Sequence, residues 1–241
     1  MGYLLVLIVG VCAGMLSGIV GTGSAMMLMP ILVVLFGPQH AVPIMAIAAV
    51  LGNFGKMAAW WRHIDWRACG AYCSTAMPGA VLGVHTLLVL PPHIVDISLG
   101  LFFIAMIPTR RWLARRAIKI SLWHLALIGG PVGFLTGIVV STGPITVPVF
   151  TSYGLEWGPF IATEAAGSLA VYVAKIIAFK SFGALPMDIV LKGLMTGMAI
   201  MTGAFMSKSL VVRMAPSTFR LVVDGLMLTS GLSLLWTAAA R

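Results

Sequence analysis

Long apolar stretches, separated by short clusters of Pro, Gly or basic residues, recur along this 241-residue chain from Tyr3 to Trp236. Several of them reach the ~20 residues that an α-helix needs to cross a bilayer. Within each stretch the apolar positions are continuous and do not alternate with polar ones, which argues against a membrane β-barrel. Because lipid offers no partner for a backbone N–H or C=O group, such stretches must be helical. The pattern predicts an all-α polytopic membrane protein.

Most of the stretches have the length of a single crossing. We expect transmembrane helices near residues 41–61, 68–90, 93–108, 158–181, 188–209 and 217–238. Two opening stretches, residues 3–36 and about 122–152, are too long for one straight crossing at 1.5 Å per residue and too short for two. Each is interrupted near its middle, by Gly21-Thr22-Gly23-Ser24 and by Ser141-Thr142-Gly143-Pro144. We interpret each as a re-entrant helical hairpin, with a broken helix that crosses as the alternative.

The chain also contains an internal repeat. Three glycines at four-residue spacing recur 119 positions later (129 − 10 = 119), so that Gly10, Gly14 and Gly18 become Gly129, Gly133 and Gly137. Lys56 falls on Lys175 at the same displacement. We therefore expect one membrane domain over residues 1–241, made of a first repeat at about 3–108, a basic linker at 109–120 and a second repeat at about 121–238.

The number of crossings decides how the two repeats are oriented. Three crossings plus a re-entrant hairpin give each repeat an odd number of passes, so the two repeats would be inverted relative to each other, as in many transporters. A broken helix that crosses would give four passes per repeat and a parallel arrangement. We favour the inverted arrangement.

The linker between the repeats is the most densely charged part of the chain. It contains Arg110, Arg111, Arg115, Arg116 and Lys119. The positive-inside rule places such a segment in the cytoplasm. Counting back through two crossings brings Arg62 and Arg67 to the same side, as the rule prefers.

Composition narrows the class of protein further. The chain is 60% hydrophobic and only 9% charged, with a mean hydropathy of +1.07, whereas soluble domains carry roughly 25% charged residues. So little charge cannot cover a water-exposed surface, and no polar segment is long enough for a soluble catalytic domain. The formal net charge of +9 is explained by basic cytoplasmic loops, and we expect no nucleic-acid partner.

Motifs for enzymatic, metal or cofactor chemistry are not found. The sequence contains no HExxH, GxSxG or P-loop pattern. Cys12, Cys69 and Cys73 form no disulfide framework. Cys69 and Cys73 would share a helix face, and we interpret them as small buried residues because no His or carboxylate completes a metal site. We therefore expect no enzyme, no metal and no cofactor.

The two interruptions have the chemistry of helix starts. Ser24 can cap the helix that follows Gly23, and Thr142 can cap a helix that has Pro144 in its first turn. Two helix N-termini at the middle of the membrane would present backbone N–H groups and positive dipole ends, which favour an anion. We therefore assign Gly21, Thr22, Gly23, Ser24, Ser141, Thr142 and Gly143 to a substrate site. The alternative is that these glycines only allow close helix packing, which is our interpretation of Gly10, Gly14 and Gly18.

Polar residues inside the predicted helices extend this candidate site. A lysine at a helix centre costs about 2.5–3.5 kcal/mol on insertion scales, so Lys56 and Lys175 are assigned to the anion, with snorkelling toward the headgroups as the alternative. Asn53 and Tyr172 precede the two lysines by one turn and join the site, or form interhelical hydrogen bonds. Glu164 could carry a coupling proton, neutralise a lysine or cap a helix start.

Two further acidic residues receive a structural interpretation. Asp65 and Asp188 occupy equivalent places after a slip of four in the repeat (188 − 65 = 123). Each precedes an apolar run at a predicted membrane boundary. We interpret both as helix N-caps without a role in transport.

With these residues in view, the chain resembles the sulfite exporter TauE/SafE family, also known as the toluene-sulfonate uptake permease family. The resemblance rests on Gly14-Met-Leu-Ser-Gly18-Ile-Val-Gly21-Thr-Gly23-Ser with Pro30, on His63-Ile-Asp65-Trp66-Arg67, on Pro78-Gly79 with Gly83, and on Gly133-Phe-Leu-Thr-Gly137 with Lys175. It covers essentially the whole chain. Family members usually have a run of glycines after Gly21, where this chain has Thr22, Ser24 and Ala25. That departure bears on the identity of the substrate.

The resemblance implies transport of a sulfur-containing or organic anion, such as sulfite, a sulfonate or sulfoacetate, across the cytoplasmic (inner) membrane of a bacterium. We expect a multi-pass secondary transporter that works by alternating access at a midplane site. A passive anion channel and an intramembrane enzyme are the alternatives. The expected partners are a small anionic substrate and the lipid bilayer, and a homodimer is left open.

Overall fold

The computed structural model describes residues 2–20, 24–114, 119–139, 142–155 and 157–210, with scattered positions between 225 and 239. Gly21, Thr22, Gly23 and Ser141 of the predicted site lie outside these ranges, as does most of the predicted helix 217–238. Within the described ranges every regular element is helical, which confirms the all-α class.

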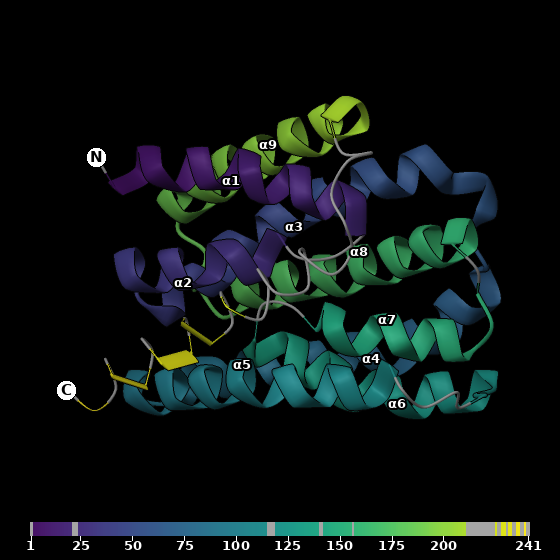
Figure 1. Ribbon diagram of the computed structural model, residues 1–241. Coiled ribbons are helices and arrows are strands. Elements are labelled where there is room, and N and C mark those ends of the chain that lie inside the picture. The colour runs from purple at the N-terminus through teal and green to yellow at the C-terminus, as the bar shows by residue number, and fades with distance from the viewer. Residues whose placement is uncertain are drawn as a thin grey trace.

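The helices follow the order of the apolar stretches (Figure 1). The first half contains α1 Gly2–Val20, α2 Ser24–Phe36, α3 Pro38–Trp60, the 3₁₀ helix η1 Trp61–His63, α4 Trp66–Val89 and α5 Pro92–Ala114. The second half contains α6 Leu122–Ile138, α7 Gly143–Ser152, α8 Trp157–Ser181 and α9 Met187–Leu210.

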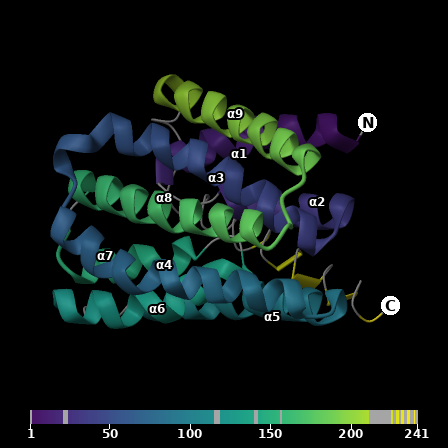
Figure 2. The ribbon, with the colours of Figure 1, turned by 180° about the vertical axis from the view of Figure 1, so that it is seen from behind.

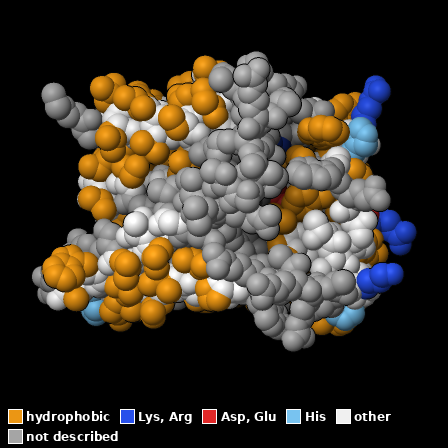
Figure 3. Space-filling model, viewed as in Figure 1, with side chains coloured by type: hydrophobic (Ala, Val, Ile, Leu, Met, Phe, Trp, Pro, Cys, Tyr) orange, Lys and Arg blue, Asp and Glu red, His pale blue; other side chains and the backbone are white. Residues whose placement is uncertain are grey.

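Three of the described helices are long and apolar enough to cross a membrane: Gln39–Ala58 in α3, all of α4, and Gly158–Ser181 in α8. They agree with the predicted helices at 41–61, 68–90 and 158–181. Large apolar side chains such as Val89, Leu127 and Leu191 are exposed on the outside. Figure 3 shows apolar groups spread over the described surface of the face that it draws. An outward-facing apolar surface is what lipid favours, so the chain is a multi-pass membrane protein.

The opening stretch of each half is two helices separated at the predicted interruption. α1 has 19 residues and α2 has 13, while α6 has 17 and α7 has 10. The N–H of Ile120 donates to the carbonyl of Ser152 (3.1 Å), so the end of α7 returns beside the start of α6. In Figure 1, α2 likewise lies toward the end of the molecule at which α1 begins. At 1.5 Å per residue α2 and α7 are about 20 Å and 15 Å long, shorter than the ~30 Å apolar core of a bilayer.

Glycines let the hairpins pack closely on the other half. α1 packs along α9, and α6 packs along α4. A Cβ added at Gly14 would lie 2.1 Å from the carbonyl oxygen of Ile200, and one added at Gly133 would lie 2.1 Å from that of Ala76. No side chain fits at such a contact, which confirms the close-packing interpretation at Gly14.

The packing between the halves keeps the same pattern when the halves are exchanged. α1 lies on α9 as its counterpart α6 lies on α4, and α3 contacts α8 and α9 as α8 contacts α3 and α4. Gly158 at the start of α8 lies against the Trp60 ring at the end of α3, so these two neighbouring helices are antiparallel. Gly193 and Gly197 of α9 lie against Ile47 and Leu51 of α3, so α3 and α9 run in the same direction. Figure 2 shows the same directions from behind.

The loop between α3 and α4 is closed by the predicted cap. The Asp65 carboxylate accepts hydrogen bonds from the backbone N–H groups of Arg67 and Ala68, both at 3.0 Å, which confirms Asp65 as an N-cap. The N–H of Asp65 donates to the hydroxyl of Thr163 on α8 at 2.9 Å. The start of α4 is thereby attached to α8.

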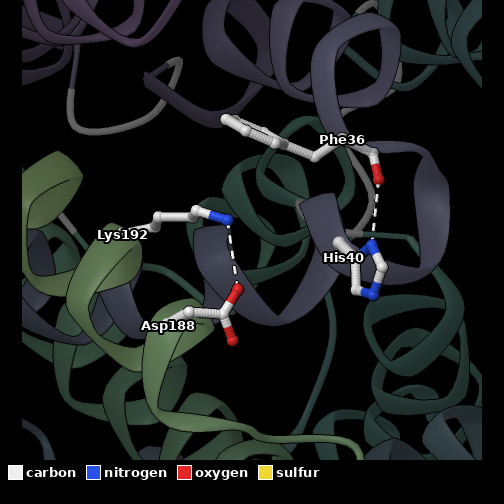
Figure 4. A network of polar contacts seen from close by, with 4 residues as sticks. All are labelled: Phe36, His40, Asp188 and Lys192. Atoms are coloured by element: carbon white, nitrogen blue, oxygen red, sulfur yellow. Dashed lines mark hydrogen bonds and ion pairs between the residues drawn. The ribbon is translucent and has the colours of Figure 1, made fainter.

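The N-cap prediction for Asp188 is wrong. Asp188 lies inside the first turn of α9, and its carboxylate forms an ion pair with Lys192 at 3.1 Å (Figure 4). The Lys192 ammonium lies 5.0 Å from the centre of the Phe36 ring, and the Phe36 carbonyl accepts a hydrogen bond from His40 Nδ1 at 3.1 Å. This network holds the turn between α2 and α3 against the start of α9. A carboxylate in the first turn is favourable near the helix dipole without being the cap.

Candidate functional site

The interruption in the second half is lined by buried hydroxyl groups. Thr142 occupies the N-cap position of α7, as predicted, but its side chain makes no capping hydrogen bond. Its hydroxyl instead lies 2.6 Å from the hydroxyl of Thr136 in α6, which donates to the carbonyl of Val132 at 2.7 Å. Because Thr136 has one hydroxyl hydrogen, Thr142 must be the donor between the two threonines. The predicted cap is therefore wrong, since a hydroxyl on a neighbouring helix competes for the side chain.

The start of α7 can attract an anion mainly through the helix dipole, because few of its backbone N–H groups are available as hydrogen-bond donors. Pro144 has no N–H group, and the N–H groups of Ile145 and Thr146 donate to the Thr142 carbonyl at 2.8 and 2.9 Å. Gly143 is also engaged in an interaction. What remains available is the positive end of the α7 dipole, next to the buried Thr142.

Lys175 lies at the same interruption from the α8 side. It is fully buried, and its ammonium donates hydrogen bonds to the carbonyls of Thr136 (2.5 Å) and Val139 (3.1 Å) at the C-terminal end of α6. The last carbonyls of a helix lack partners within it, and its C-terminal dipole end favours a cation. Lys175 therefore caps α6 beside the start of α7. Its burial and these bonds rule out the snorkelling alternative for Lys175.

Lys56 and Asn53 lie one turn apart on α3. Lys56 is half-buried and interacts electrostatically with Glu164 of α8. Asn53 is 7% exposed, and within the described part of the chain its amide has no hydrogen-bond partner. Tyr172 is buried and packs against Ala46 and Ala49 of α3. Lys56 and Tyr172 thus take part in the contact between α3 and α8.

Glu164 is the buried carboxylate of this region, at 5% exposure. Its Oε1 accepts hydrogen bonds from the Ser168 hydroxyl at 2.8 Å and from the Thr146 hydroxyl at 3.4 Å. Glu164 also interacts electrostatically with Tyr72 of α4. The hypothesis that Glu164 caps the start of α8 is wrong, because it lies two turns inside a helix that begins at Trp157.

At the first interruption α1 ends at Val20 and α2 begins at Ser24. Ser24 is half-buried and is the first residue inside α2, so the helix begins within one residue of the predicted start, but Ser24 does not occupy the N-cap position.

Three residues that take part in these buried polar contacts were not predicted from the sequence: Thr136, Thr146 and Ser168. Hydroxyl residues inside apolar helices usually bond to a carbonyl of their own helix, as Thr151 does here. Single hydroxyl residues therefore carried little signal. The four-residue spacing of Glu164 and Ser168, which places both on one helix face, could have found one of the three.

The cysteines and the other metal-binding types of side chain that the structure describes form no second site. Cys69 and Cys73 are buried on one face of α4 with their sulfur atoms 3.9 Å apart, as small buried residues would be. Among the residues that the structure describes, no cluster of three His, Cys, Asp or Glu side chains lies close enough together to hold a metal ion.

Interrupted helices, an apolar outer surface and a buried polar group between the helices define a polytopic α-helical membrane protein. The sequence profile of the sulfite exporter TauE/SafE family matches residues 6–234, and the chain belongs to this family. The chain is similar to the "Probable membrane transporter protein YjnA" of Bacillus subtilis (strain 168), with 23% identity over 253 residues that cover 95% of this chain and 98% of the relative. No solved structure matches the chain. Family and relative both indicate membrane transport and not an enzyme.

Proposed function

We propose that the protein is a secondary transporter that moves a sulfur-containing or organic anion, such as sulfite, a sulfonate or a sulfoacetate-like compound, across the bacterial cytoplasmic membrane by alternating access. The observation that carries the proposal is the buried ammonium of Lys175. Within the described residues its hydrogen bonds are to two carbonyls, and no carboxylate pairs with it. A buried charge is costly unless it is compensated, and an anion at the interruption would compensate it.

The start of α7 places a second positive element beside this lysine. The ammonium of Lys175 is bonded to the end of α6, and Thr142, at the start of α7, is hydrogen-bonded to Thr136 in the same last turn. The positive dipole end of α7 therefore adds to the field of the lysine, as discontinuous helices do for anionic substrates in other transporters. Asn53 of α3 is buried, and its amide has no partner among the described residues, so we assign it as a further donor to the anion.

The two halves are inverted repeats in this proposal. Support comes from the antiparallel arrangement of the counterparts α3 and α8 and from the packing pattern that survives exchange of the halves. In Figures 1 and 2 the short helices α2 and α7 lie toward opposite ends of the molecule. Two hairpins that enter from opposite ends suit a site that opens to one side at a time.

Purified protein in liposomes provides the test. The liposomes are loaded with radiolabelled sulfite. Unlabelled sulfite, thiosulfate, small sulfonates and small carboxylates are then offered outside as exchange partners. A carrier gives saturable counterflow that depends on the anion outside. Ohmic anion current without counterflow would favour the passive channel, and absence of both for every anion tested would refute transport of this class.

A further inference from the structure

The buried acidic group of the second half has no counterpart in the first. At the repeat displacement of 119, Glu164, Ser168 and Thr146 correspond to Met45, Ala49 and Met27. Lysine, by contrast, stands at the equivalent place in both halves, as Lys56 and Lys175. The carboxylate and its two hydroxyl partners therefore form a feature of one half only, added to a scaffold that the two halves share.

These three side chains connect a short interrupted helix to a long one. Ser168 belongs to α8, as Glu164 does, whereas Thr146 belongs to α7. The Thr146 hydroxyl lies 3.4 Å from Glu164 Oε1 and 3.2 Å from the carbonyl oxygen of Gly143 in its own helix. Since a hydroxyl has one hydrogen to donate, Thr146 has two competing acceptors, one on each helix.

We infer that Glu164, Ser168 and Thr146 form a proton-binding site, separate from the anion site, whose occupancy controls the attachment of α7 to α8. The inference rests on the proposed function, because it assigns the coupling ion of that transporter. With Glu164 ionised, Oε1 accepts both hydroxyl hydrogens in charge-assisted bonds, which are roughly twice as strong as neutral ones. When the carboxylate takes up a proton it becomes a neutral acid, and the Thr146 hydroxyl turns to the Gly143 carbonyl. α7, which begins at the anion site, is then released from α8.

The charged and titratable groups that face Glu164 determine how its protonation affects the binding of an anion. From α3 the ammonium of Lys56 acts on it, and from α4 the Tyr72 phenol. The residues of α7 include no titratable side chain. Lys175 stands three turns further along α8 and is bonded to the end of α6. The positive charge of Lys56 attracts the ionised carboxylate, and protonation of Glu164 ends that attraction, so that more of the Lys56 charge can act on an anion that enters together with the proton.

Infrared difference spectroscopy of the purified protein during a pH titration tests the proton site without any substrate. The chain has only six acidic side chains, so the carboxylic-acid C=O band of a single group can be assigned. Wild type should show a titrating band that Glu164→Gln removes. Thr146→Val and Ser168→Ala each remove a donor to the ionised form, and should raise the titration midpoint of that band by about one pH unit or more.

Two substitutions on the same helices serve as matched controls. Thr151→Val on α7 and Ser181→Ala on α8 remove hydroxyls whose hydrogen bonds, among the described residues, are to carbonyls of their own helix. Both should leave the midpoint unchanged. An identical titration in wild type and Glu164→Gln would overturn the inference. A titration midpoint that shifts when Na⁺ is added would also overturn the inference, because the group would then be a sodium site.

Transport of radiolabelled sulfite in liposomes separates this inference from the proposed function. Glu164→Gln should retain sulfite counterflow and lose accumulation driven by an imposed pH gradient. Accumulation that survives in Glu164→Gln would overturn the proton site while leaving the anion carrier standing. If wild type moves no sulfite at all, the proposed function fails for this anion, and the infrared titration still decides whether Glu164 binds the proton.

Discussion

Replacing Lys175 by Met removes the buried charge at the interruption while keeping a side chain of similar length. In the wild-type structure the ammonium donates to the carbonyls of Thr136 and Val139 and is completely buried. Met fills the same space and donates nothing. The substitution therefore separates two roles of Lys175, the cap on α6 and the positive charge offered to an anion.

The expected change in stability is small, because two terms oppose each other. Two buried carbonyls that lose their donor cost about 1–3 kcal/mol each. Removing an ammonium from the interior of a membrane helix recovers about 2.5–3.5 kcal/mol. The free energy of unfolding should therefore change by no more than about 3.5 kcal/mol. Anion affinity has no compensating term, since truncating one partner of a buried charge pair costs about 2–5 kcal/mol, and each 1.4 kcal/mol is tenfold in Kd.

We expect Lys175→Met to weaken anion binding by more than about tenfold, measured by titrating sulfite and small sulfonates against tryptophan fluorescence of the purified protein. Lys175→Arg should retain part of the affinity. Lys192→Met is the matched control, because that lysine lies at the surface and pairs with Asp188. Unchanged anion affinity in Lys175→Met, together with a large loss of stability, would show that Lys175 is only a helix cap.

Three further predictions concern the fold and the anion site. Gly133→Val should prevent assembly, since even a Cβ would lie 2.1 Å from a carbonyl of α4, whereas Gly70→Val, with nothing within 4 Å of the added Cβ, should fold; size-exclusion chromatography distinguishes them. Alkaline phosphatase fused after Arg241 should be active and a fluorescent protein dark if the repeats are inverted, and the opposite pair of results would support the parallel arrangement. Ser24→Ala and Thr142→Ala should each weaken anion binding modestly, and a double-mutant cycle should depart from additivity by more than ~0.5 kcal/mol if both starts contact one anion.

The sequence by itself determined the features that depend on local composition and spacing. Continuous apolar stretches with little charge allow only buried helices in lipid, so the class followed directly. Both interruptions were found because Gly, Ser, Thr and Pro break a helix wherever they cluster, and α2 and α7 begin at Ser24 and Gly143 as a result. The cap at Asp65 is also a local signal, since its carboxylate and the backbone N–H groups that donate to it lie within three residues of each other.

Only the tertiary structure decided which groups meet across helices. Lys175 was predicted to bind the anion directly, yet its ammonium reaches carbonyls 39 and 36 positions away in sequence. Thr142 bonds to a hydroxyl of α6 instead of capping α7, and Glu164 is joined by Thr146 of another helix. Sequence periodicity states which face of a helix a side chain occupies, but the partner depends on where two helices cross. Here that crossing depends on close contacts at glycines, which bring the backbones together without specifying which polar groups will lie beside them.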